Sequence, residues 1–394
     1  MLNIIAWLMV GYSDGIIYSI MEITGISGYA LYILPIFLAY LLFLFTNYSV
    51  KISQSSLKRQ AFILLIFALT AILHYTTVGS FYVFGYLQIM AMMSMIFLIR
   101  DLFTTNETVL RPGFAIGLLA VHYILCGYAI LSWATLNIAD IDISLFVSDQ
   151  ENLYNLTVIR TSGLQREPAW AGYAISSSYL AILTTRPQRL LFAQLAFLGG
   201  IAATGSGVGL VLAALFITYQ MLMTRKGSLG MRLLFLVGVA VVTSVVFSSR
   251  ISNVVNQDDP STQMRIESSN VALDVIAETF PVGTGFGNYQ DHADFDPYIW
   301  GGFLNLDEAS YYKSDILALN IIAEMGVFGC ILLLAFAGNF VCRTAPLVTV
   351  MALVMMLSSG TMIMPFYFVL AAICGLERGR MGRLQAQNAK EKQR

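Results

Sequence analysis

Charged side chains are scarce in this sequence, and several that could do chemistry lie together in one polar stretch. Arg160, Arg166 and Glu167 come directly before Pro168, which suits the first turn of a helix. Guanidinium groups bind phosphate through paired hydrogen bonds, and a carboxylate can accept a proton from a reacting group. Glu167 would equally be favoured by the helix dipole as a capping acid. The local sequence leaves two interpretations open, a reactive cluster and an interfacial anchor.

A second polar stretch contains a cluster of glycines. In order, it carries Arg250, Arg265, Gly283, Gly285, Gly287 and Tyr289. The cluster is similar to a loop that cradles phosphate, but it lacks the lysine of a P-loop. Alone, it predicts a tight turn whose backbone closely approaches another part of the chain. In the turn that follows, Asp291, His292, Asp294 and Asp296 are more typical of a solvated acidic turn than of a divalent-cation site.

Further ionisable side chains fall in apolar segments. Asp315 would lie at the outer mouth of a helix, and Glu324 about 13 Å deeper along it. An ionisable group at that depth is costly and suggests a function, with a structural hydrogen bond to a neighbouring helix as the equal alternative. His74 and His122 stand alone and are interpreted as buried histidines with satisfied hydrogen bonds rather than as ligands.

The elements that must position these residues are membrane helices. Of the 394 residues, 57% are hydrophobic and 11% are charged, and the mean hydropathy is +0.73. Soluble domains carry roughly 25% charged residues, so a soluble domain and a disordered chain are both excluded. The net charge of -1 offers no basic surface to a nucleic acid. The four cysteines are isolated in the sequence, which argues against a disulfide scaffold or a zinc site.

The fold class is therefore an all-α integral membrane protein. A span needs about 20 apolar residues, and about 12 segments qualify. They are 3–21, 27–46, 61–78, 81–99, 114–135, 169–185, 190–203, 207–223, 232–248, 315–337, 345–359 and 362–376. Either 190–203 with 207–223 or the last two segments could form a re-entrant hairpin, which leaves about 10 spans as the alternative.

Most of the 22 Lys and Arg residues fall on alternate connections, which predicts cytoplasmic N- and C-termini. The remaining cations are Arg160, Arg166, Arg250, Arg265 and Lys313. They all lie in two long outer loops, and because long ordered loops usually carry function, we expect the chemistry there. The chain divides into an N-terminal bundle 1–136, a first outer loop 137–168, central helices 169–248, a second outer loop 249–314, C-terminal helices 315–376 and a basic cytoplasmic tail 377–394, expected to be disordered.

The order of these pieces resembles the O-antigen polymerase and O-antigen ligase superfamily of bacterial membrane glycosyltransferases. The resemblance covers roughly 155–335. It rests on Arg160, Gly163, Glu167-Pro168, Thr204-Gly-Ser206-Gly, Arg265, Pro281-x-Gly283-x-Gly285-x-Gly287-x-Tyr289 and Glu324-x-Gly326-x-x-Gly329. The ligase branch shows a His-Asn pair where this sequence has Asp315-Ile316. The missing histidine favours a polymerase over a ligase.

The resemblance implies a GT-C-like architecture in the bacterial inner membrane, with the active site at the periplasmic face. Its donor and acceptor would be glycans linked to undecaprenyl diphosphate, and membrane lipid and a chain-length-regulating copolymerase are the other expected partners. The alternatives are a ligase that transfers glycan to lipid A core, and a polysaccharide flippase or other transporter. A sensor or assembly partner without catalysis is a further, less favoured alternative.

Such a donor implies roles for the residues above. Developing negative charge on the diphosphate calls for guanidinium groups, first Arg160 and Arg265 and then Arg250 and Arg166. The attacking hydroxyl calls for a carboxylate, first Asp315 and then Glu167. The substrate-binding loop would consist of Gly283, Gly285, Gly287 and Tyr289. Because arginines can supply the charge, no metal or other cofactor is expected, and single-step attack implies inversion at the anomeric carbon.

Overall fold

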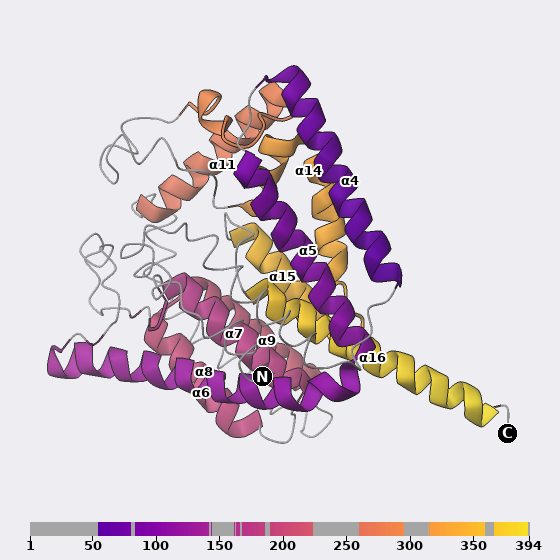
Figure 1. The fold of residues 1–394 in the computed structure, drawn as a ribbon. Helices are drawn as coiled ribbons and strands as arrows, with labels where there is room; N and C mark the ends of the chain where they lie inside the picture. Colours follow the sequence, from indigo (N-terminus) through magenta and orange to yellow (C-terminus); the bar gives the residue numbers. More distant parts are fainter. Residues whose placement is uncertain are drawn as a thin grey trace.

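The structure is a computed structural model in which the regular elements of the described residues are all helices (Figure 1). The described residues are 54–79, 83–141, 143, 161, 163–165, 168–185, 190–223, 260–294, 314, 316–358 and 366–392. The elements are α4 (Gln54–Thr77), α5 (Val83–Thr105), α6 (Glu107–Ala139), α7 (Pro168–Thr185), α8 (Leu190–Thr204), α9 (Gly207–Met223), α11 (Pro260–Thr279), the 3-10 turn η3 (Tyr289–Asp291), α14 (Leu317–Phe340), α15 (Pro346–Ser358) and α16 (Phe366–Lys392).

Four of the described helices are long and apolar enough to cross a membrane: Gln54–Thr77, Gly85–Thr105, Glu107–Ala139 and Leu317–Phe340. Leu191–Thr204, Gly207–Met221 and Pro346–Ser358 are apolar but shorter. Helical structure is thus confirmed for this part of the chain, whereas the count of about 12 spans stays a prediction. The segments 3–21, 27–46 and 232–248 lie outside the described residues.

Helix α16 packs directly against α5 because two glycines four residues apart face it. A Cβ atom at Gly375 would lie 2.7 Å from the Phe103 Cβ, and one at Gly379 would lie 2.6 Å from the Thr104 carbonyl oxygen. Small residues with this spacing let helix backbones approach closely, which is a common way to join helices in a membrane. The contact brings the middle of α16 to the start of α6.

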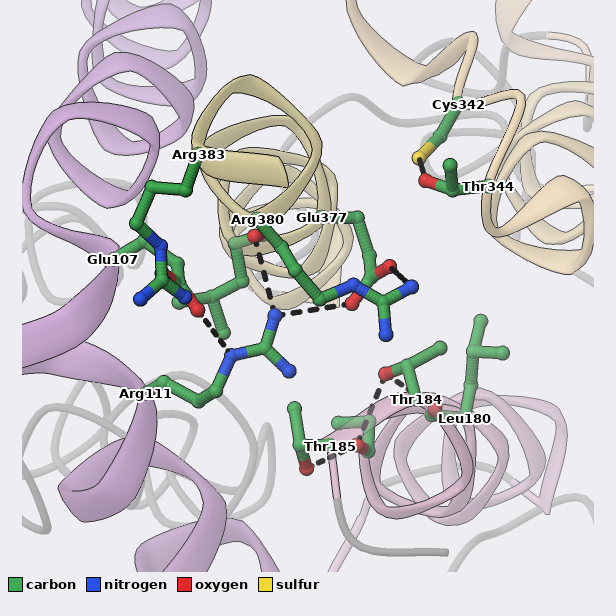
Figure 2. Close-up of polar contacts among 12 residues, drawn as sticks. Glu107, Arg111, Leu180, Thr184, Thr185, Cys342, Thr344, Glu377, Arg380 and Arg383 are labelled. Atoms are coloured by element: carbon green, nitrogen blue, oxygen red, sulfur yellow. Dashed lines mark hydrogen bonds and ion pairs between the residues drawn. The ribbon is translucent and has the colours of Figure 1, made fainter. Parts of the chain in front are cut away.

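At that contact, two buried carboxylates from α6 and α16 hold a cluster of arginines (Figure 2). The side chains of Glu107 and Glu377 are each 3% exposed. Arg111 lies 2.5 Å from Glu107 and 3.1 Å from Glu377. Arg380 lies 2.7 Å from Glu377, and Arg383 pairs with Glu107. Each carboxylate thus bridges two arginines, and the paired charges offset the cost of burial.

Other cations also lie at the end of the helix bundle that contains Glu107 and Glu377. They come from connections that the sequence predicts to lie on one face of the membrane. Arg59, near the start of α4, lies 2.6 Å from Asp101, near the end of α5. Arg100 donates to the carbonyl oxygen of Asn339, at the end of α14, and Arg378 donates to that of Val341. This gathering supports the predicted sidedness. That the face is cytoplasmic stays a prediction.

The expectation that 377–394 forms a disordered tail is wrong for the residues described. α16 continues as one helix to Lys392, and its second half extends away from the other helices (Figure 1). The ion pairs of Glu377, Arg380 and Arg383 anchor its middle. The residues beyond them are mostly Gln, Ala, Lys and Glu, which favour helix even when exposed.

The turn between α8 and α9 lies beside Thr161, a described residue of the loop 137–168. The amide of Thr161 donates to the carbonyl oxygen of Ala203, and a Cβ at Gly172 would lie 3.2 Å from the Gly209 Cα. Gly205 occupies this turn with a φ of 56°, which favours glycine. The turn therefore lies level with the start of α7. This placement is compatible with both arrangements predicted for α8 and α9, two spans or a re-entrant hairpin.

We predict that Glu377→Gln lowers the free energy of unfolding by about 1–2 kcal/mol, because the amide lacks the negative charge shared by Arg111 and Arg380 and places an NH2 donor against one of them. Glu391→Gln, the same change at an exposed position of α16, should stay within about 0.5 kcal/mol of the wild type. SDS titration in mixed micelles measures both values. Equal loss in the two variants would show that the Glu377 pairs contribute no stability.

Candidate functional site

A break in α14 organises the candidate site. Gly326 has a φ of 56° and a ψ of -132°, so the helix is interrupted where Ala323, Glu324 and Met325 are buried. An added Cβ at Gly329 would collide with the carbonyl oxygen of Ile321, so the two halves of α14 approach closely. The motif Glu324-x-Gly326-x-x-Gly329 thus combines a break in the helix with a close backbone contact at Gly329 that admits only glycine.

The loop 281–287, here called the Gly-rich loop, supplies the backbone hydrogen bonds that the break leaves open. The amides of Thr284 and Gly285 donate to the carbonyl oxygens of Ala323 and Glu324 at 2.9 and 3.0 Å. In return, the amide of Val327 donates to the carbonyl oxygen of Pro281 at 2.9 Å. Unsatisfied backbone groups are costly away from water, so the loop and the broken helix depend on each other.

Two glycines make this contact possible. Gly283 has a φ of 85°, and a Cβ there would lie 2.6 Å from the Gly326 amide nitrogen. A Cβ at Gly326 would overlap the Pro281 carbonyl oxygen. The structure confirms the close backbone approach predicted for the glycine cluster.

Four consecutive amides of the Gly-rich loop, those of Val282 to Gly285, are already used within the protein. Those of Val282 and Gly283 both donate to the carbonyl oxygen of Thr279, at the end of α11, and those of Thr284 and Gly285 donate to α14. In this conformation these amides are not offered to a phosphate. Of the four predicted loop residues, Gly283, Gly285 and Tyr289 are buried and Gly287 is exposed. Their role in binding substrate stays a prediction.

Tyr289 and Glu324 are buried beneath the loop. The Tyr289 ring belongs to a small core with Val271, Ala272, Val275 and Ala323 that joins α11 to the first half of α14. Its hydroxyl is buried and has no hydrogen-bond partner among the described residues. Burial, and then the Glu324 charge, raise the pKa of Tyr289 well above its usual value. The phenol therefore stays neutral at physiological pH.

Of the predicted charged site residues, the structure describes Arg265 alone. Arg265 is exposed on α11, and its backbone carbonyl accepts hydrogen bonds from the hydroxyls of Ser268 and Ser269. Since α11 packs on α14, Arg265 belongs to the same unit as the Gly-rich loop. Arg160, Arg166, Glu167, Arg250 and Asp315 lie outside the described residues.

The described neighbours of Arg160 and Asp315 are well anchored. The Thr161 hydroxyl lies 2.8 Å from that of Ser132 on α6 and accepts from the amide of Gly163 at 3.0 Å. Beside Asp315, the side-chain amide of Asn320 donates to the carbonyl oxygen of Ser314 at 2.6 Å. These contacts fix the chain on one side of each predicted site residue.

His74 and Tyr86 also support the site, a role that the sequence does not predict. His74 is a buried histidine with satisfied hydrogen bonds, as predicted, but its partners are Tyr86 and the carbonyl oxygen of Val282, 2.8 Å away. No spacing or motif connects α4 with a loop some two hundred residues later. His122 is satisfied in the same way, by Ser178 and the carbonyl oxygen of Ala193.

The acidic turn after the Gly-rich loop has the character of a solvated turn. Asp291 and Asp294 are exposed, and His292 lies 3.1 Å from Glu278 of α11. Among the described residues, no group of three or more His, Cys, Asp or Glu side chains could hold a metal ion. Asp296 lies outside them.

We predict that Gly326→Ala lowers the free energy of unfolding by about 2–5 kcal/mol, because it adds a strained positive φ to an overlap with the Gly-rich loop. Gly338→Ala is the matched control: it lies on the same helix, and an added Cβ would meet no heavy atom within 4 Å. The control should change stability by less than about 1 kcal/mol. Stability is measured by SDS titration. Equal unfolding midpoints for the two variants would contradict the close contact between Gly326 and the Gly-rich loop.

Comparison with known proteins matches residues 191–334 to the family described as O-antigen ligase. The matched part runs from α8 through α11 and the Gly-rich loop to α14, and so contains the break at Gly326. No curated protein and no solved structure matches the chain. The match supports a place in the O-antigen ligase and polymerase superfamily of membrane glycosyltransferase-like enzymes, and with it a part in O-antigen polymerisation or ligation.

Proposed function

We propose that this protein is a polymerase that joins undecaprenyl-diphosphate-linked oligosaccharide repeat units into O-antigen or a related surface polysaccharide. The reaction would take place at the periplasmic face of the bacterial inner membrane. The observation that carries the proposal is the family match over 191–334, which includes the Gly-rich loop and the broken helix it supports. The choice of polymerase rests on Asp315, which stands where a ligase would have histidine.

The proposed reaction is a single displacement at the anomeric carbon. A hydroxyl oxygen of the acceptor glycan bonds to that carbon, and its proton passes to a carboxylate, first Asp315 and second Glu167. The bond from the anomeric carbon to the diphosphate oxygen breaks, and undecaprenyl diphosphate leaves with the electron pair. Attack opposite the leaving group inverts the configuration.

Arginines are proposed to stabilise the leaving diphosphate. Arg265 and Arg160 are the first candidates, with Arg250 and Arg166 in reserve, because guanidinium groups bind phosphate oxygens in pairs. The engagement of the Gly-rich loop amides with α11 and α14 supports this division of roles. The negative charge of the diphosphate is then stabilised by arginine side chains. The role of the loop is to align α11, which carries Arg265, with the start of α14.

The ligase is the second candidate, because the matched family is described as O-antigen ligase. It would pass finished glycan to lipid A core through the same arginines. A flippase or transporter is less well supported. Transporters do use broken helices to coordinate solute, but the backbone groups at the break in α14 are occupied by the Gly-rich loop.

We predict that purified protein in liposomes converts undecaprenyl-diphosphate-linked repeat units from its source strain into a ladder spaced by one repeat unit. Arg160→Ala and Arg265→Ala should slow the reaction about 100- to 1,000-fold, and Asp315→Asn about 100- to 10,000-fold. Arg343→Ala, which removes an exposed cation beyond the other end of α14, should leave the rate unchanged.

The products on a gel distinguish the candidates. A single transferred product that appears only after lipid A core is added would replace the polymerase with the ligase. If an authenticated substrate gave no product under either condition, while glycolipid crossed the bilayer, the transporter would replace both.

A separate prediction concerns metal ions. Because arginines are proposed to supply the positive charge, we expect the ladder to survive exhaustive chelation with EDTA. The measurement is the initial rate before chelation, after chelation, and after Mg²⁺ is restored. Loss of the ladder that Mg²⁺ reverses would contradict a metal-independent reaction.

A further inference from the structure

Two side chains from the N-terminal helices reach the Gly-rich loop from outside the family match. Nε2 of His74, on α4, lies 2.8 Å from the carbonyl oxygen of Val282, and Nδ1 hydrogen-bonds the Tyr86 hydroxyl of α5. The Tyr86 ring meets Phe286 of the loop edge-on, with centroids 4.5 Å apart. Both side chains are buried. The loop is therefore held by α4 and α5 as well as by α11 and α14.

The contacts fix where the imidazole proton lies. A carbonyl oxygen can only accept, so Nε2 of His74 must carry the proton that it donates to Val282. In the neutral ring Nδ1 then accepts from the Tyr86 hydroxyl. The result is a directed chain from Tyr86 through His74 to the loop backbone.

The hydrogen bond from His74 reaches the part of the loop that is bonded to α14. Val282 lies between Pro281, which accepts from Val327, and the amides of Thr284 and Gly285, which donate to α14. A Cβ at Gly285 would lie 3.5 Å from Nδ1 of His74, so the imidazole also packs against the loop. His74 thus holds the loop through contacts separate from those that the loop makes with α14.

We propose that His74, oriented by Tyr86, is a positioning residue for glycosyl transfer. It keeps the Gly-rich loop seated in the break of α14, and so sets the placement of α11, which carries Arg265, relative to the start of α14, which follows Asp315. The catalytic part of this inference rests on the proposed function. The seating of the loop can be tested without it.

The chain offers a matched control in His122. This histidine is also fully buried in apolar surroundings, and it also joins a hydroxyl, that of Ser178, to a backbone carbonyl, that of Ala193. Its partners lie on α7 and α8, away from the Gly-rich loop. Replacing either histidine removes equivalent hydrogen bonds, so a general loss of stability should affect both variants alike.

The first measurement is hydrogen–deuterium exchange of the segment 280–290 in the full-length protein. In His74→Leu, the Thr284 and Gly285 amides should exchange roughly five- to tenfold faster, the factor expected when one hydrogen bond is lost. Tyr86→Phe, which keeps the ring against Phe286, should show a smaller increase. His74→Gln, which can still donate to Val282, should restore protection. Unchanged exchange in His74→Leu, or an equal change in His122→Leu, would overturn the inference.

The second measurement is the steady-state rate of the same variants in the liposome assay. His74→Leu should lower kcat roughly tenfold or more with little change in KM, because catalytic groups are misaligned while substrate contacts remain. His74→Gln should recover most of the rate, and His122→Leu should keep the kcat of the wild type per folded molecule. Faster exchange without loss of kcat would refute the catalytic role. If the wild type makes no ladder, the proposed function fails, and exchange alone decides how the loop is held.

Discussion

The structure depends on one constraint: the backbone groups freed where α14 breaks at Gly326 must find partners inside the protein. Hydrocarbon offers none, and each unpaired group would cost several kcal/mol. The Gly-rich loop provides partners through Thr284, Gly285 and Pro281. The helix break therefore requires the loop. The loop in turn connects α11 to α14 and draws support from α4.

This constraint assigns a physical role to glycines that look like a phosphate loop. Gly283 and Gly326 allow two backbones to meet where a single methyl group would not fit. The amides of Val282 and Gly283 bond to the end of α11, and those of Thr284 and Gly285 bond to the carbonyl groups at the break in α14. In the proposed function, arginine side chains bind the diphosphate, and the motif Glu324-x-Gly326-x-x-Gly329 is part of the scaffold that places α11 against the start of α14.

Features set by local composition were predictable from the sequence. The apolar run 169–185 matches α7, and 207–223 matches α9, because length and hydropathy decide where such helices form. Contacts between distant segments were not predictable. Nothing in the sequence near His74 identifies Val282 as its partner, and an apolar run gives no hint of a positive φ at Gly326. The polar composition of 377–394 predicts a disordered tail. The sequence does not show the ion pair between Glu377 and Arg111 of α6, which forms only when the two helices meet in the fold.

The most direct test of the account is an experimental structure in lipid nanodiscs with an undecaprenyl-diphosphate-linked glycan bound. We predict that the diphosphate contacts the guanidinium group of Arg265 while the Thr284 and Gly285 amides remain bonded to Ala323 and Glu324. A diphosphate bound by the amides of the Gly-rich loop, with the loop detached from α14, would contradict the account.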